Sequence, residues 1–345
     1  MEFKRPPRLK AGDRVAVVTP SWGGPSVHPN VYAAGIHALE SLLALQAVEY
    51  PCTHQTPEWL SQHPEARAED INSAFADPSI SAIVATIGGS DSSRILAHID
   101  TQLIVENPKI LLGFSDTTTI LTQANQAGIV TFNGPSLMAG IAQLGRLPHW
   151  LEHVRQLLFE PSPRYRYKPF AQSAADYPDW DNDGAHGEVA QLFDNDVWHW
   201  VNGTGVHRGQ LFGGCVDVLE FLKGTRFWPP PSFWNKKLLF LETSEDNPSP
   251  TQVRDWLFNY GIQGVFDQIN GLLVGRPHGY SPAQIDELDQ MILSTVVGQF
   301  GAIELPILTN LDFGHTYPQW ILPLGVLAEI DFDKGGLQLL ESPVA

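Results

Sequence analysis

The sequence has few cysteines, few basic residues and no long apolar run, and each shortage excludes a class of protein. Only two of its 345 residues are cysteines, Cys52 and Cys215, which is too few for a disulfide framework or a thiolate zinc site. Lysine and arginine number 21 against 38 acidic residues, and the net charge of −17 disfavours nucleic-acid polymers and anionic membranes as partners. No apolar run could span a bilayer, and the first residues lack the apolar core of a signal peptide. We therefore expect a reduced, cytoplasmic protein that acts on a small molecule.

Apolar runs alternate with helical periodicity along the first 145 residues. The runs that have the composition of buried parallel strands are residues 14–19, 82–87, 110–112 and 129–132. Apolar residues at helical spacing predict helices over residues 30–45, 67–75, 94–99 and 118–125. This alternation predicts an α/β fold in which residues 1–145 form an N-terminal domain with a doubly wound parallel sheet.

The rest of the chain divides into two parts. Residues 146–207 are rich in proline, tryptophan and acidic residues, which indicates a linker and an irregular loop able to fold over an active site. Trp198 and Trp200 stand at strand spacing within it, and we expect them in the core or at an interface. Residues 208–345 predict a smaller, mixed C-terminal domain. Its expected strands cover 237–241, 271–275 and 303–308, its helices 216–222, 251–260 and 282–297, and its terminal hairpin 326–331 and 337–340.

A serine stands where the third of these strands turns into a helix. The stretch Gly113-Phe114-Ser115-Asp116-Thr117 follows an apolar run and precedes the helical pattern. Strand, tight turn and helix is how many α/β enzymes present a nucleophile, and the start of the helix offers unpaired N–H groups for a developing oxyanion. Ser115 or Asp116 could equally be an N-cap, since both residue types are favoured there.

The glycine pair Gly88-Gly89 ends the preceding strand. In an open α/β sheet, ligands collect outside the carboxyl ends of the strands, and the ends that carry this pair and Ser115 are consecutive along the chain. Glycine lets the backbone approach a ligand and point an N–H group at it, although a plain turn is the commoner use of such a pair.

A serine nucleophile needs a base and an acid that orients the base. Glu242 ends a strongly apolar strand, where a carboxylate is costly unless it is paired, and His315 follows another apolar stretch. The order Ser…Glu…His is that of α/β-hydrolases, but Thr117 replaces the second glycine of their G-x-S-x-G motif. With 12 histidines in the chain, spacing alone leaves the three residues' adjacency open.

Nine short stretches, spread over almost the whole chain, carry a family resemblance. They are Gly12-Asp13-Arg14-Val15, Ile87-Gly88-Gly89, Asn107-Pro108-Lys109-Ile110, Gly113-Phe114-Ser115-Asp116-Thr117-Thr118, Gly134-Pro135, Gly213-Gly214, Leu241-Glu242-Thr243-Ser244-Glu245, Gly275-Arg276-Pro277 and Gly314-His315-Thr316. In this order they resemble the LD-carboxypeptidase family of serine peptidases, which includes the microcin C immunity proteins (MccF-like).

The resemblance implies a catalytic triad of Ser115 as nucleophile, His315 as general acid/base and Glu242 as the orienting partner. It implies an oxyanion hole formed by the N–H groups of Gly88 and Asp116, with Gly89 as the alternative to Gly88. It also implies an N-terminal domain like that of class I glutamine amidotransferases, an active site between two domains, and a homodimer. No cofactor or metal is implied.

Two departures from the family pattern bear on the substrate. Ser90-Asp91 replaces the Tyr-Gly that follows the glycine pair in murein-cleaving members, and Cys215 replaces an asparagine. The first departure favours the immunity-protein branch, in which a loop tryptophan stacks on adenine, and Trp180 is the candidate here. We expect a serine hydrolase that cleaves an amide in a microcin C-like aspartyl-adenylate or related aminoacyl- or peptidyl-nucleotide. The alternatives are a murein tetrapeptide LD-carboxypeptidase and a binding protein that has lost turnover.

Overall fold

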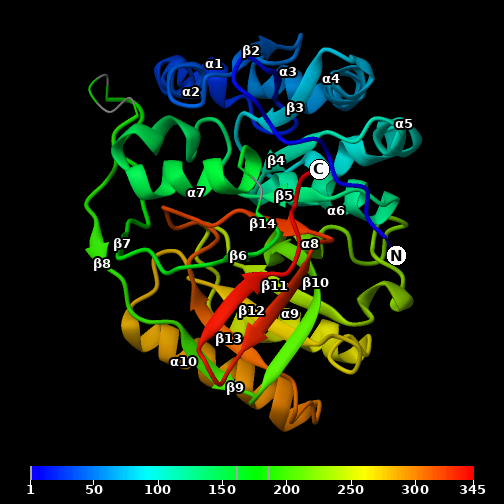
Figure 1. Cartoon of the computed structure of the whole chain (residues 1–345), viewed down its shortest axis with the longest axis vertical. Coiled ribbons are helices and arrows are strands. Elements are labelled where there is room, and N and C mark those ends of the chain that lie inside the picture. Colours follow the sequence, from blue (N-terminus) through cyan, green and yellow to red (C-terminus); the bar gives the residue numbers. More distant parts are fainter. Residues whose placement is uncertain (1, 161, 183, 185–186) are drawn as a thin grey trace.

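Two large β-sheets dominate the computed structural model, which describes residues 2–160, 162–182, 184 and 187–345 (Figure 1). The first sheet has the strand order β14-β5-β4-β3-β1-β2. Every neighbouring pair in it is parallel except β14 and β5, which are antiparallel. Its strands are β1 (Arg14–Val18), β2 (Gln46–Glu49), β3 (Ile80–Ala85), β4 (Ile110–Gly113), β5 (Thr131–Asn133) and β14 (Leu322–Leu324). The expected N-terminal parallel sheet is thus confirmed.

Helices connect the parallel strands of this sheet, as parallel strands require, and two more follow β5. They are α1 (Gly24–Val27), α2 (Pro29–Ser41), α3 (Pro57–Gln62), α4 (Pro64–Ala76), η1 (Ser92–His98), α5 (Thr101–Glu106), η2 (Ser115–Thr117), α6 (Thr118–Ala127), η3 (Ile141–Arg146) and α7 (Pro148–Leu158). No helix in the described ranges is both long and apolar enough to cross a membrane.

The second sheet is larger and mixed, with the order β6-β16-β15-β10-β11-β12-β13-β9. Its four central strands are parallel, and antiparallel strands flank them on both sides. The strands are β6 (Tyr165–Arg166), β9 (His199–Asn202), β10 (Val206–Cys215), β11 (Lys237–Glu242), β12 (Gly271–Gly275), β13 (Ile307–Leu311), β15 (Leu327–Asp331) and β16 (Gly336–Leu339). The associated helices are α8 (Val216–Glu220), η4 (Pro231–Trp234), α9 (Pro250–Ile262), α10 (Pro282–Leu293) and η5 (Ser294–Gln299), and β7 (Gln172–Ser173) pairs with β8 (Phe193–Asp194).

The elements that differ from the sequence expectations include α7, β10 and β13. Helix α7 lies in the stretch expected to be irregular, where Pro148 begins the helix and Trp150, Val154 and Leu157 form its buried face. Residues 206–215 form the long strand β10, whereas only the helix after them was expected. Strand β13 begins at Ile307 and not at residue 303, because residues 303–304 form a turn and Pro306 has no N–H group to donate to the sheet.

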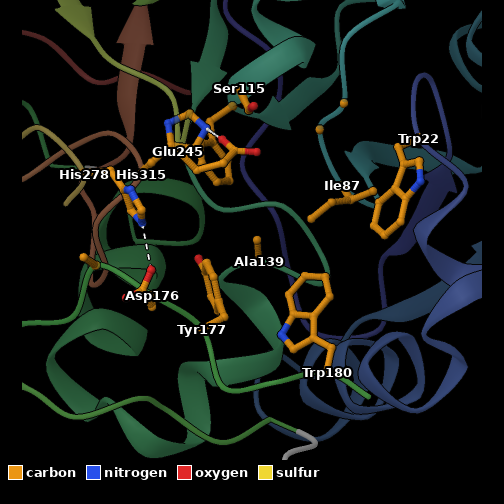
Figure 2. A pocket seen from close by; sticks show the side chains of 14 residues that line it. Trp22, Ile87, Ser115, Ala139, Asp176, Tyr177, Trp180, Glu245, His278 and His315 are labelled. Carbon is orange, nitrogen blue, oxygen red and sulfur yellow. Dashed lines mark hydrogen bonds and ion pairs between the residues drawn. The ribbon is translucent and has the colours of Figure 1, made fainter. Parts of the chain in front are cut away.

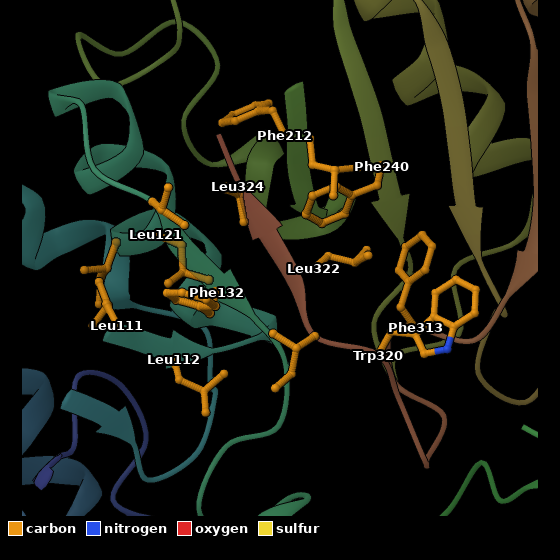
Figure 3. Close-up of a cluster of buried hydrophobic side chains, with 14 of the residues drawn as sticks. Leu111, Leu112, Leu121, Phe132, Phe212, Phe240, Phe313, Trp320, Leu322 and Leu324 are labelled. Atoms are coloured by element: carbon orange, nitrogen blue, oxygen red, sulfur yellow. The ribbon is translucent and has the colours of Figure 1, made fainter. Parts of the chain in front are cut away.

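Strand β14 joins the two sheets into one packed unit. It comes from the C-terminal part of the chain but pairs with β5 of the first sheet. Figure 3 shows Leu322 and Leu324 between side chains of the first sheet, such as Phe132, and Phe212 and Phe240 of the second. All five side chains are buried in one continuous hydrophobic cluster. Trp198 and Trp200 are half-buried against this cluster, in agreement with the expected structural role.

Candidate active site

Ser115 sits on a sharp turn between β4 and α6. Its φ is +56°, a left-handed conformation that non-glycine residues seldom adopt and that is frequent at strained functional turns. A Cβ on Gly113 would come within 2.8 Å of the Thr117 side chain, so the first glycine of the motif makes room for the threonine that replaces the second. The turn lifts the serine to the wall of a pocket of about 550 Å³.

Gly88, at the carboxyl end of the neighbouring strand β3, packs directly against this serine. A Cβ on Gly88 would lie 2.8 Å from Ser115 Oγ and 3.5 Å from the backbone nitrogen of Asp116. The two peptide groups predicted for the oxyanion hole are therefore neighbours at the nucleophile. Gly89 has a φ of +146° and packs on Ser21 and Trp22, so a side chain there would be strained and crowded.

The Asp116 carboxylate is fully buried below the turn and connects three loops. It accepts hydrogen bonds from Ser21 Oγ and from the backbone N–H of Ser92, while Ser92 Oγ donates to the Asp116 carbonyl oxygen. Burial raises the pKa of Asp116, and these hydrogen bonds oppose that rise. The side chain thus holds in place the turn whose backbone N–H was the predicted oxyanion donor.

Glu242 and His315, which are 73 residues apart in sequence, meet in a buried hydrogen bond of 2.7 Å between Oε2 and Nδ1. Glu242 ends β11, and His315 lies in the segment that leaves β13. Gly314 has a φ of +107°, and a Cβ there would lie 2.8 Å from Glu242 Cβ, so glycine is needed for this close approach. The ring of Phe114 lies 5.0 Å from the imidazole on its other side.

The second imidazole nitrogen, Nε2, faces a second carboxylate. Glu245 Oε2 lies 2.9 Å from it, within ion-pair distance. His315 and Ser115 line the same pocket, but the described hydrogen bonds include none between His315 Nε2 and Ser115. Burial alone would lower the pKa of His315, but the carboxylates of Glu242 and Glu245 outweigh it and raise the pKa to about 10. The close contact with His315 in turn lowers the pKa of Glu245 to about 2.

An aromatic wall faces these polar groups across the pocket. Figure 2 shows Trp22 and Trp180 on one side, His278, Glu245 and His315 on the other, and Tyr177 between them. Trp180, the predicted stacking residue, does line the pocket and is half-buried, with its ring 5.7 Å from that of Tyr177. Trp22 and Tyr177 were not expected here. Trp22 follows the carboxyl end of β1, and that position was a signal that could have identified it.

The same polar region contains one cluster with metal-ligand chemistry. Cys215 Sγ, a Glu242 oxygen and a His315 nitrogen all lie within 4.8 Å of one another. Glu242 and His315 are already bonded to each other, and burial raises the pKa of the Cys215 thiol well above its usual range. The Glu242–His315 hydrogen bond accounts for the closeness of two of the three members.

A serine at a strand–helix turn and a histidine bonded to a buried glutamate line one pocket of an α/β fold, an arrangement that is typical of serine hydrolases. Residues 15–134 match the LD-carboxypeptidase N-terminal domain, and residues 208–330 match the LD-carboxypeptidase C-terminal domain. The two matches cover more than half of the chain. The protein therefore belongs to the LD-carboxypeptidase family and is a serine peptidase or related hydrolase.

Curated relatives and solved structures agree with this assignment. The microcin C7 self-immunity protein MccF of Escherichia coli is 26% identical over 339 residues, which cover 96% of this chain and 94% of the relative. A crystal structure of an MccF-like protein from Streptococcus pneumoniae in complex with AMP is 29% identical, with a TM-score of 0.82 and coverage of 95% of this chain and 98% of that chain. MccF in complex with glutamyl sulfamoyl guanosine shares the fold, with 24% identity, a TM-score of 0.87 and coverage of 99% of both chains.

Proposed function

We propose that this protein hydrolyses an amide bond in an aminoacyl- or peptidyl-nucleotide through an acyl-enzyme, with Ser115, His315 and Glu242 as its triad. The observation that carries the proposal is one pocket that contains the serine, the histidine bonded to a buried glutamate, and an aromatic wall. The triad is suited to acyl transfer, and the aromatic wall offers flat faces on which a nucleobase can stack.

The reaction follows from these positions. Ser115 Oγ attacks the carbonyl carbon while its proton passes to His315 Nε2, and the carbonyl oxygen becomes an oxyanion. The N–H groups of Gly88 and Asp116, or of Gly89 in place of Gly88, stabilise that charge. His315 then donates the proton to the leaving nitrogen, the amide bond breaks, and the acyl group remains on Ser115. A water molecule, deprotonated by His315, releases the acid and regenerates the serine.

Glu242 holds the imidazole through Nδ1, so that Nε2 is the nitrogen that exchanges protons with Ser115. Burial raises the pKa of Glu242 and His315 opposes that rise, while the lack of water around the pair leaves their attraction unscreened. This is the role of the acidic member of a triad, which orients the histidine and stabilises its charged form.

The nucleotide part of the proposal rests on Trp180 and Trp22. Stacking of a base on an aromatic ring contributes about 1–3 kcal/mol, and an indole offers the largest flat face among the side chains. The MccF-like protein of Streptococcus pneumoniae was solved with AMP, which supports a nucleotide ligand for this chain as well.

A second candidate is a murein tetrapeptide LD-carboxypeptidase, and the observation that favours it is the family match itself. The experiment is to incubate the protein with an aminoacyl-adenylate analogue joined by an acyl–phosphoramide bond, and separately with an LD-tetrapeptide. Mass spectrometry follows release of the free amino acid or of D-alanine, with Ser115→Ala as control. We expect the wild type to cleave the nucleotide and Ser115→Ala to leave it intact. If the wild type instead releases D-alanine efficiently and does not cleave the nucleotide, the second candidate is supported.

A further inference from the structure

Glu245 is a carboxylate that the triad does not need. It follows β11 by three residues, lines the pocket, and places Oε2 2.9 Å from Nε2 of His315. Glu242 already holds the other nitrogen of the imidazole. The Glu245 side chain is 64% exposed, so it can leave the imidazole without a large change in the fold.

In this position Glu245 opposes catalysis. Nε2 is the atom that must accept the proton of Ser115, and it can do so only when it carries no proton of its own. Carboxylates at both nitrogens favour the doubly protonated, cationic form of the imidazole. The two carboxylates raise the pKa of His315 to about 10, although burial alone would lower it. The resting histidine is therefore a poor base until one carboxylate finds another partner.

The new partner must be a cation that comes with the substrate. Among the described residues that line the pocket there is no lysine or arginine, and the other acidic one, Asp176, is paired with His278 at 3.1 Å. The aminoacyl part of a substrate carries an α-ammonium group on the carbon next to the reacting carbonyl. When that carbonyl carbon lies about 3 Å from Ser115 Oγ, the ammonium is within reach of a carboxylate that touches His315.

We propose that Glu245 binds the α-ammonium group of the substrate's aminoacyl part and thereby releases Nε2 of His315. The inference rests on the proposed function and specifies its substrate as one with a free α-amino group. As Glu245 moves to the ammonium, the Nε2 proton passes to solvent, and Nδ1 keeps its proton toward Glu242. Since the described pocket lining has no basic side chain that is always charged, the preferred aminoacyl residue is neutral or basic, and not the aspartyl residue expected from the family resemblance.

The first test compares two aminoacyl-nucleotides that differ only in N-acetylation of the α-amino group. The wild type is expected to prefer the free amine in kcat/KM by at least about tenfold, since a hydrogen bond between charged groups contributes roughly that much. Glu245→Gln should lose this preference. Asp246→Asn is the matched control, because Asp246 is the next residue, is exposed and does not line the pocket. An unchanged preference in Glu245→Gln, with turnover intact, overturns the inference and leaves the proposed function standing.

A second test needs no amino group in the ligand. A serine-reactive phosphonate should label Ser115 faster in Glu245→Gln than in the wild type or in Asp246→Asn at neutral pH, because Nε2 is then free to accept the serine proton. Equal labelling rates would show that Glu245 does not prevent Nε2 of His315 from accepting the serine proton. A wild type that labels at Ser115 but cleaves neither nucleotide would overturn the proposed function, and the ammonium assignment with it.

Discussion

Replacement of Trp180 by alanine removes part of the aromatic wall and leaves Ser115, His315 and Glu242 unchanged. The indole is half-buried and packs edge-on against Tyr177 at 5.7 Å and His28 at 5.4 Å, so much of its face remains available to a ligand. If a nucleobase stacks there, the lost contact contributes about 1–3 kcal/mol. That energy corresponds to a rise in KM of roughly 5- to 100-fold for an aminoacyl-adenylate substrate.

The assay is steady-state kinetics on an aminoacyl-adenylate and on an LD-tetrapeptide, together with a thermal melt of each variant. A tetrapeptide has no base to stack, so its activity should change by no more than a few-fold. Trp59→Ala is the control, because Trp59 is also half-buried and stacks on His63 at 3.9 Å but does not line the pocket. A fall in both activities and in melting temperature would show that Trp180 is a packing residue, and an unchanged KM for the adenylate would refute the stacking argument.

Four further predictions concern the triad and the oxyanion hole. Ser115→Ala should lower kcat by roughly 10⁴-fold or more with little loss of stability, and a phosphonate should label Ser115 alone in the wild type; unchanged turnover would exclude it as nucleophile. Glu242→Gln should slow the reaction and lower the apparent pKa of His315 in a pH–rate profile. The folded-state pKa of His315 is raised to about 10, so the stability that its protonation contributes is complete below about pH 6.5 and is lost toward pH 10. The melting temperature of the wild type should therefore fall between these pH values, and that of His315→Gln should fall less. Gly88→Ala, whose Cβ would lie 2.8 Å from Ser115 Oγ, should reduce kcat by about 10²-fold or more while circular dichroism stays native.

The residues at the carboxyl ends of the strands could be predicted from sequence because the strands are almost entirely buried. Strands β3, β4 and β11 are nearly continuous apolar runs, so the polar residues that follow them were visible as strand-end residues. Gly88, Ser115 and Glu242 were all found in this way. Helix α7 was missed because proline and tryptophan in the surrounding stretch concealed its helical spacing.

Contacts between distant segments could not be read from the sequence. The bond between Glu242 and His315 depends on the register of β12 and β13 and on the close approach that Gly314 permits. Nothing in the spacing of Glu245 indicated that it would reach Nε2 of the same histidine. Strand β14 has only three residues, and its partner β5 is almost 200 residues earlier in the chain, so no local pattern could assign it to the first sheet.

That short strand explains how the site is held together. Ser115 belongs to the first sheet, while Glu242 belongs to the second. The segment that carries His315 leaves β13 in the second sheet and enters β14 in the first, so it is fixed at both ends. Leu322 and Leu324 bury the second of these ends in the shared core (Figure 3). The distance between Ser115 and His315 is therefore set by packing between the sheets, while the exposed Glu245 side chain can move without disturbing that packing.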